Sequence, residues 1–343
     1  MDHNLTTKTR SGINVVAIGG GNGLSTLLSG LKYFVKSGGS ENEVIENLSA
    51  IVAVTDDGGS SGRLRDELNI LPPGDIRNCM VALSEDSQTL SRLFTHRFSG
   101  DGDLGGHSFG NIFLAALSNL TGDFAEAVRL SCEILASKGR IFPATNSDVR
   151  LAAELADGKI VHGETKIGHV GTMIKRLFLE PADCRPLPDA MSAIRNADII
   201  TIGPGSLFTS LLPPLLVEGV SDAIAGAKAV KIFVCNLMTQ PGETDGFNAG
   251  RHLDLIGQYA PTIKFDFVVM NNRPISGVQL EKYADEGADQ IGLKGSISPG
   301  RIGGAKIICD NLLDEGEMVR HNPERLAHTV LACARQPHIA AAK

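Results

Sequence analysis

The sequence predicts an α/β protein built on a doubly wound, mostly parallel sheet. Three observations lead to this prediction. Short apolar, β-branched runs alternate with amphipathic stretches, which is typical of parallel strands covered by helices on both faces. Two of these runs, residues 13–18 and 199–202, end in glycine-rich turns that open a helix, as in Rossmann-like sheets. The 343 residues contain no Pro/Ser/Gly-rich linker, so we expect a single interrupted domain over residues 1–343.

The core elements follow in chain order. The strand at 13–18 leads through a glycine turn into a helix over 24–35, whose apolar residues recur at helical spacing. Residues 48–54 are apolar enough for a second buried strand. Further buried strands are expected at 230–235 and 267–270, after the one at 199–202.

The pattern becomes helical between about residues 87 and 138. Residues 90–98, 109–120 and 124–136 each predict a helix, and together they would form an insert or cap on the sheet.

A small antiparallel element is expected at about 148–180. Residues 149–155 and 159–163 flank an Asp157-Gly158 dipeptide, which is typical of a tight β-hairpin in which both central residues have positive φ. Residues 175–180 alternate as a third strand would.

Composition excludes several classes of protein. A net charge of −7, no run of Lys/Arg and no Trp argue against a dedicated nucleic-acid binder. No apolar stretch reaches the roughly 18 residues that span a bilayer, and the polar N-terminus does not resemble a signal peptide. The six cysteines are widely spaced without a CxxC pair, so we expect reduced thiols in a cytoplasmic protein.

Ligands of open parallel sheets bind beyond the carboxyl ends of the strands, so polar loops there are candidate sites. The first such loop contains Gly20, Gly21, Asn22 and Gly23, whose backbone amides can face an anion at a helix N-terminus. No Lys follows these glycines, so the loop is not a P-loop. Leu24 at the third small position also makes it a poor dinucleotide fingerprint, which disfavours an NAD-dependent dehydrogenase.

The second loop combines Thr55, Asp56, Asp57, Ser60 and Ser61 with three glycines. Carboxylates at a strand end can bind Mg²⁺, accept ribose hydroxyl groups or act as a general base. The alternative is a solvated turn, because Asp-Gly and Ser-Gly are common in loops.

The third region is a Pro-Pro-Gly turn followed by Asp75, Arg77 and Asn78. Asp75 is a candidate N-cap, and Arg77 could clamp a phosphate or pair with an acidic residue of the site. A purely structural cap is the competing interpretation. His107 and Asn111 open the next helix, and the Asn111 amide suits a base edge or a sugar.

The fourth region follows the strand at 199–202 and again has a glycine turn that opens a helix. A polar segment follows the next strand, at 230–235. This arrangement predicts a second anion site with amide side chains beside it. The candidate ligand contacts here are Gly203, Pro204, Gly205, Ser206, Asn236, Thr239 and Gln240.

Taken in order, these segments resemble one protein family. The matching stretches are VVAIGGGNG, AVTDDGGSSGRLR, PPGDIRNC, GNIFLAAL, ADIITIGPGSLFTSLLP and VCNLMTQPGETDGF, between residues 15 and 247. They resemble the family that unites 2-phospho-L-lactate transferase (CofD) with the bacterial YvcK/GlmR gluconeogenesis factors, and TDDGGSSG and NLMTQPGET are closer to the YvcK branch. Two positions depart from the family pattern: Asn22 stands where Thr is frequent, and Arg251 where an acidic residue precedes His252.

The resemblance implies a regulator that binds UDP-N-acetylglucosamine and adjusts envelope-precursor supply and cell shape on gluconeogenic carbon. In that reading the two glycine loops hold the pyrophosphate, while Asp56, Asn111 and Asn236 hold the ribose or base. The alternative is a Mg²⁺-dependent transferase that acts on a nucleotide-linked donor, in which Asp56 and Asp57 are the catalytic and metal-binding residues. The resemblance and fold analogy further imply a homodimer and an enzyme partner that the protein regulates.

Overall fold

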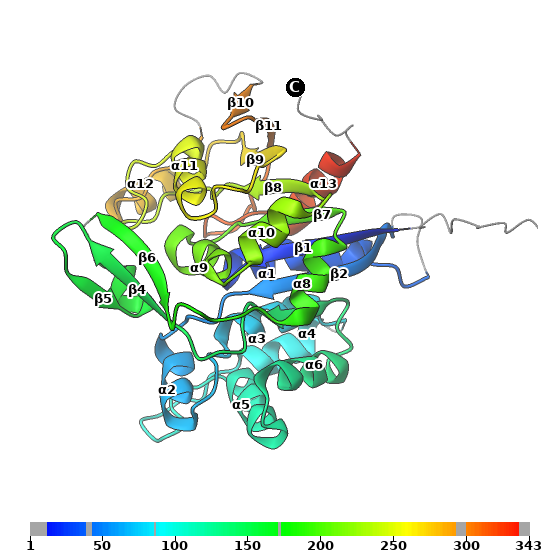
Figure 1. The fold of residues 1–343 in the computed structure, drawn as a ribbon, viewed down its shortest axis with the longest axis vertical. Coiled ribbons are helices and arrows are strands. Elements are labelled where there is room, and N and C mark those ends of the chain that lie inside the picture. Colours follow the sequence, from blue (N-terminus) through cyan, green and yellow to red (C-terminus); the bar gives the residue numbers. More distant parts are fainter. Residues whose placement is uncertain (1–11, 39–42, 86, 171–172, 293–299, 336–343) are drawn as a thin grey trace, which may run out of the picture.

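A computed structural model describes residues 12–38, 43–85, 87–170, 173–292 and 300–335 (Figure 1). Its large sheet has eight strands in the order β10-β11-β9-β8-β7-β1-β2-β3, and a three-stranded sheet has the order β5-β4-β6. The strands are β1 (Ile13–Gly19), β2 (Ile45–Val52), β3 (Arg140–Pro143), β4 (Arg150–Leu155), β5 (Ile160–His162), β6 (Ile174–Glu180), β7 (Ile199–Ile202), β8 (Val230–Val234), β9 (Phe267–Asn271), β10 (Arg301–Ile302) and β11 (Ala305–Asp310).

Helices connect the strands and cover both faces of the large sheet. They are α1 (Gly21–Leu31), α2 (Gly59–Leu68), α3 (Gly74–Leu83), α4 (Ser87–Thr95), α5 (Phe109–Thr121), α6 (Phe124–Ile134), α7 (Glu164–Ile167), α8 (Pro188–Arg195), α9 (Leu212–Leu216), α10 (Val220–Gly226), α11 (Ala249–Tyr259), α12 (Gly277–Asp285) and α13 (Pro323–Ala334). Two shorter turns are η1 (Lys32–Phe34) and the π-helical η2 (Leu207–Leu211).

The strand order reverses between β1 and β7. From β1 the chain adds β2 and β3 on one side, and β7, β8, β9 and β11 then follow on the other. All these neighbours pair in parallel, and only β10 pairs antiparallel with β11. Such a reversal opens a crevice at the carboxyl ends of the two strands, which fixes where a ligand can enter.

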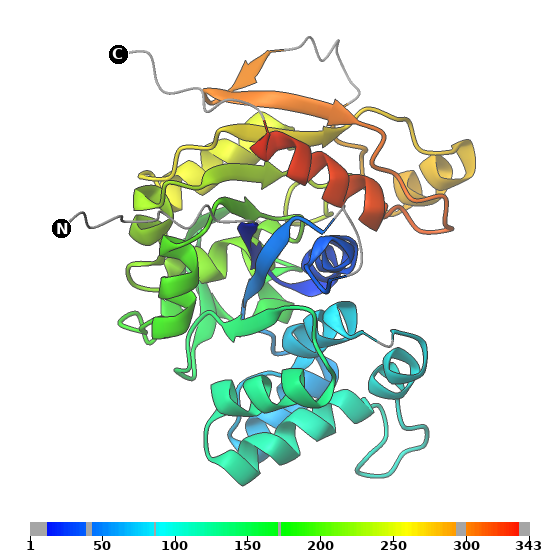
Figure 2. The ribbon, with the colours of Figure 1, turned by 90° about the vertical axis from the view of Figure 1, so that its right-hand side faces the viewer.

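Alternate residues of each buried strand contribute to two separate cores. Val15 and Ala17 face α1, α3 and α13, whereas Val16 and Ile18 face α8 to α11 and the small sheet. Figure 2 shows α13, in red, beside α1, in blue. A Cβ on Gly30 of α1 would lie 2.0 Å from the Pro323 carbonyl oxygen, so only glycine permits this close packing.

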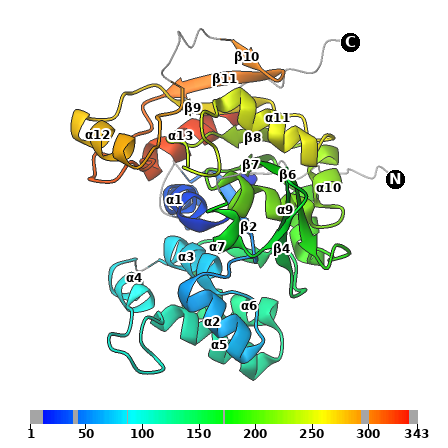
Figure 3. The same ribbon diagram turned by 90° about the vertical axis from the view of Figure 1, so that its left-hand side faces the viewer.

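The insert and the small sheet lie at different places on this core. Helices α2 to α6 form the lower part of the molecule in Figure 3, and β4, β5 and β6 lie at the left of Figure 1. The predicted fold class, the helical insert and the small antiparallel sheet are confirmed. The hairpin expectation was wrong in one detail, because only Gly158 of the turn has positive φ.

Two further expectations can be compared with the structure. All six cysteines are free thiols. In the part of the chain that the structure describes, no single helix has the length and apolarity needed to cross a membrane; one bent pair, Leu207–Leu216 with Val220–Gly226, meets these criteria jointly.

Candidate functional site

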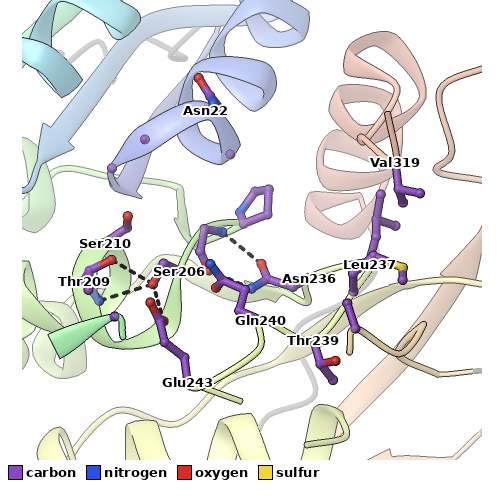
Figure 4. Close-up of a pocket in the computed structure, with 18 of the residues that line it drawn as sticks. Asn22, Ser206, Thr209, Ser210, Asn236, Leu237, Thr239, Gln240, Glu243 and Val319 are labelled. Carbon is purple, nitrogen blue, oxygen red and sulfur yellow. Dashed lines mark hydrogen bonds between the residues drawn. The ribbon is translucent and has the colours of Figure 1, made fainter. Parts of the chain in front are cut away.

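A cavity of about 770 Å³ opens at the carboxyl ends of β1, β7 and β8, at the reversal of strand order (Figure 4). Its walls are the two glycine loops, the segment after β8, the α7 region of the small sheet, and a C-terminal segment around residues 318–321. The predicted residues that line it are Gly20, Gly21, Asn22, Gly23, Asp56, Pro204, Gly205, Ser206, Asn236, Thr239 and Gln240.

The first glycine loop turns directly into α1. Gly20 is the N-cap residue and provides no side-chain cap, and Gly21 begins the helix at a φ of 61°, which favours glycine. Gly20 has no side chain to cap α1, so the N-terminal amides other than that of Gly21, which Asp75 accepts, can stabilise an anion in the cavity. A Cβ on Gly23 would lie 2.3 Å from the Pro204 carbonyl oxygen, so the two loops are in close contact.

Polar side chains hold the second glycine loop, residues 203–206, in place. The Gly205 amide donates to Asn236 Oδ1 at 3.0 Å, and Asn236 Nδ2 donates to the Gly205 carbonyl oxygen at 2.8 Å. Ser206 Oγ donates to Glu243 Oε2 at 2.6 Å and accepts from Thr209 Oγ1 at 2.8 Å (Figure 4). Asn236, expected to hold the ribose or base, therefore links the loop after β7 to the end of β8.

Two half-buried carboxyl groups, Asp75 and Glu164, lie close to the first glycine loop. Burial and the nearby Asp56 carboxylate raise the pKa of Asp75 to about 6, although Asp75 also accepts the Gly21 amide. Burial, together with Asp75 and Asp56, raises the pKa of Glu164 well above its usual range. Thr55 Oγ1 donates to Glu164 Oε2 at 3.2 Å and so links the end of β2 to α7. A carboxyl group with a raised pKa carries less negative charge near neutral pH than one with an ordinary pKa, and so repels an anionic ligand less.

We expect Asp75→Asn to raise stability at pH 7.5 by on the order of 2 kcal/mol, since one pKa unit corresponds to about 1.4 kcal/mol. The folded protein holds the Asp75 proton more tightly than the unfolded chain does. Protonated Asp75 therefore contributes to the free energy of unfolding at acidic pH, and this contribution is lost as the pH rises through about 6. Asn cannot ionise, so the variant avoids that loss. Urea unfolding at pH 7.5 and pH 5 measures the difference, which should shrink at pH 5. Asp254→Asn, at an exposed position of α11, is the control; equal effects of both variants would contradict the assignment.

Several predicted residues form a buried network beside the cavity rather than its lining. Ser60 Oγ lies 3.0 Å from His107 Nδ1 and accepts from Asn111 Nδ2 at 3.0 Å. Arg77 donates to Ser108 Oγ at 2.8 Å and to Asn78 Oδ1 at 2.6 Å. The other predicted residues that do not line the cavity are Thr55, Asp57, Ser61, Asp75 and Gly203.

We expect Arg77→Met to destabilise the protein by about 3 kcal/mol, because it leaves buried hydrogen-bonding groups without their charged partner. Arg77 is 8% exposed and makes these bonds between α3 and the start of α5. Chemical denaturation of the ligand-free protein tests this. Unchanged stability with a tenfold loss of nucleotide affinity would instead assign Arg77 to direct ligand contact.

The structure separates the two adjacent aspartates. Asp56 lines the cavity, whereas Asp57 Oδ1 accepts from the Thr165 amide at 2.8 Å and from Thr165 Oγ1 at 2.7 Å, at the start of α7. Within the described ranges, no group of three or more His, Cys, Asp or Glu side chains is arranged to hold a metal ion. The protein side chains therefore do not fit a self-contained Mg²⁺ site at the predicted pair.

The C-terminal wall was not predicted from the sequence. It contributes Arg320 and His321, with Tyr283 of α12 beside them in the lining, and Arg320 is the only Lys or Arg among the described lining residues. Burial lowers the pKa of His321 to about 4, so the ring is neutral, and it donates to the Cys235 carbonyl oxygen. These residues follow the last recognisable motif and carry no local signal of their own.

Lining residues from the α7 region and from the segments after the second glycine loop and β8 were also not predicted. Glu164 and His169 come from the α7 region, which has no motif. Thr209, Ser210 and Glu243 lie inside quoted motifs, where hydroxyl and carboxyl groups next to the glycines were the available signal. Arg251, the departure noted above, lies outside the cavity with its guanidinium 5.7 Å from the Phe247 ring.

Two glycine loops that line one cavity at a strand-order reversal are the arrangement in which doubly wound α/β proteins bind nucleotide ligands. The 2-phospho-L-lactate transferase CofD family model matches residues 15–313, and the chain belongs to this family. Its full-length relatives place it in the gluconeogenesis-factor branch. It is 44% identical to the gluconeogenesis factor of Halalkalibacterium halodurans, over 93% of this chain and 95% of that one. It is 42% identical to the gluconeogenesis factor of Bacillus subtilis, over 91% and 95%.

A solved structure agrees with this relationship. The crystal structure of a Bacillus halodurans protein superposes with a TM-score of 0.86 at 44% sequence identity, covering 93% of this chain and 99% of that one.

Proposed function

We propose that the protein is a cytoplasmic regulator that binds a nucleotide sugar of the UDP-N-acetylglucosamine type. Its role would be to balance envelope-precursor supply and maintain cell shape during growth on gluconeogenic carbon. The observation that supports this most directly is the pair of glycine loops that touch each other and together line the 770 Å³ cavity. One loop opens α1 and the other opens η2, so a pyrophosphate bound against both would meet two helix N-termini.

The remaining lining suits a sugar nucleotide. The volume lies in the range of sites that enclose a ligand of this size. Carboxyl groups of Asp56, Glu164, Glu243 and Glu286 line the cavity and can accept hydrogen bonds from sugar hydroxyls. Arg320 supplies the cation for a phosphate, and Leu237 and Val319 supply apolar surface for a base (Figure 4).

The family match favours a second candidate, a Mg²⁺-dependent transferase of the 2-phospho-L-lactate type. Mg²⁺ is commonly held by one or two carboxylates together with substrate phosphates. Asp56, which lines the cavity, would supply one such carboxylate. The position of Asp57 against α7 speaks against the predicted Asp56–Asp57 pair as its ligands. We therefore place the non-catalytic regulator first.

A thermal-shift screen separates these functions. A ligand that binds only the folded state raises the free energy of unfolding, by about 2.7 kcal/mol at a ligand concentration a hundredfold above Kd. The Tm rises accordingly. We expect UDP-N-acetylglucosamine to raise Tm, and GDP with Mg²⁺ and NAD to leave it unchanged. Stabilisation by GDP only with Mg²⁺ would support the transferase, and stabilisation by NAD alone would contradict both proposals.

We also propose that regulation acts through an enzyme partner and that the chain forms a homodimer. Light scattering of the purified protein at micromolar concentration tests the dimer, and a monomeric mass would contradict it.

A further inference from the structure

A second cavity of about 790 Å³ lies between α6, the edge strand β3 and the start of α8. It shares no lining residue with the first cavity. Figure 1 shows α6 and α8 on the same side of the molecule, away from the small sheet. Its size is typical of small-molecule sites, and neither glycine loop contributes to it.

The floor of this cavity is apolar. Ile141, Phe142 and Pro143 come from β3, and Leu187 and Pro188 come from the segment that opens α8. Cys132 adds a thiol from α6, and burial raises its pKa to about 11, so it is uncharged at neutral pH. An apolar side chain that lies on this floor would be removed from water against apolar and uncharged groups.

Most charged groups around the cavity already have partners. Arg129 pairs with both Glu126 and Glu133. Asp123 accepts from the Glu126 amide and from Asn146 Nδ2, each at 2.8 Å. These groups are not free to bind a ligand ion without losing an existing contact.

Two opposite charges at the cavity remain without an ion pair among the described residues: Arg140 of β3 and Asp189 in the first turn of α8. Both residues also line an adjoining polar cavity of about 240 Å³, so they lie at the junction of the two. No ion pair joins the Arg140 guanidinium to the Asp189 carboxylate. The Arg140 guanidinium lies 5.8 Å from the centre of the Phe142 ring and therefore borders the apolar floor.

We propose that this second cavity binds a small apolar zwitterion, either an amino acid with a large apolar side chain or a short apolar peptide. The ligand carboxylate would pair with Arg140, its ammonium group with Asp189, and its side chain would lie on Phe142 and Leu187. One molecule with both charges would contact both groups, which do not form an ion pair with each other. A regulator with such a site would respond to a second metabolite besides its nucleotide sugar.

The chain contains no Trp, so L-tryptophan is a probe whose fluorescence has no background from protein tryptophan. We expect its emission to shift and its anisotropy to rise on titration with the protein. Tryptamine lacks the carboxylate and indole-3-propionate lacks the ammonium group, and each should bind about tenfold more weakly. The dipeptide Leu-Trp separates the two sources: tighter binding than L-tryptophan indicates a peptide ligand, and weaker binding indicates a free amino acid.

Variants of Arg140 and Asp189 test which charged group of the ligand each residue contacts. Arg140→Met should weaken L-tryptophan about tenfold and leave tryptamine unchanged, whereas Asp189→Asn should weaken L-tryptophan and leave indole-3-propionate unchanged. Arg185→Met and Asp183→Asn make the same charge changes at exposed positions outside the cavity and should have no effect. Circular dichroism confirms that each variant is folded. Absence of binding by every indole probe, or equal affinity for L-tryptophan in all four variants, would overturn the proposal.

Discussion

Replacing Gly23 by Ala is expected to abolish nucleotide-sugar binding and to destabilise the fold. The added Cβ would lie 2.3 Å from the Pro204 carbonyl oxygen and 2.9 Å from the Gly205 amide nitrogen, so the two loops must separate. Overpacking of this kind costs about 1 to 3 kcal/mol. We expect at least a roughly hundredfold loss of affinity, since in the proposed complex both loops contact the pyrophosphate and these contacts depend on the spacing of the loops. Calorimetry with UDP-N-acetylglucosamine and a thermal melt measure the two effects.

Gly257→Ala is the matched control. Gly257 lies within α11 and a Cβ there meets nothing within 4 Å, so alanine should be neutral or stabilise the helix by up to about 1 kcal/mol. Full binding by Gly23→Ala would show that the contact between the loops does not shape the site. Equal losses in the two variants would mean that any helix glycine has this effect.

Replacing Arg320 by Ala is expected to lower nucleotide-sugar affinity by roughly tenfold to a hundredfold, as loss of charge-assisted hydrogen bonds to a phosphate would. Among the described residues that line the cavity, Arg320 is the only Lys or Arg, whereas four lining residues carry a carboxyl group. Without it, the site has little to offset their repulsion of a diphosphate. Titration at two salt concentrations measures the affinity and its electrostatic part.

The control for this prediction is Arg195→Ala, which removes an exposed arginine at the end of α8. It should bind as the unmodified protein does. If Arg320→Ala also retained full affinity at low salt, the phosphate would have to be held by the loop amides alone.

The central strands of the large sheet and the two glycine loops could be predicted from the sequence. Residues 13–18 and 199–202 are mostly apolar and are followed by glycines, and both strands are buried and parallel. Strand-end loops converge in any parallel sheet, so Gly21 and Ser206 could be expected in one cavity. The short edge strand β3 and the C-terminal β11 were missed, because their runs are short or only half-buried.

The remaining part of the site depends on packing that has no local signal. Asp57 points to α7 because a helix N-terminus more than 100 residues later lies against it. Arg77 is held by Ser108, which belongs to the insert. Arg320 reaches the cavity only because the segment before α13 returns beside α1. Each case joins residues that are distant in sequence, and motif spacing does not encode such contacts.

Calorimetric titration of the protein with UDP-N-acetylglucosamine, first with Mg²⁺ and then with EDTA, tests the central claim most directly. The account predicts one binding site per chain, with the same affinity in both buffers and no product formed. Binding that strictly requires Mg²⁺ and is accompanied by turnover, or no binding of the nucleotide sugar in either buffer, would contradict it.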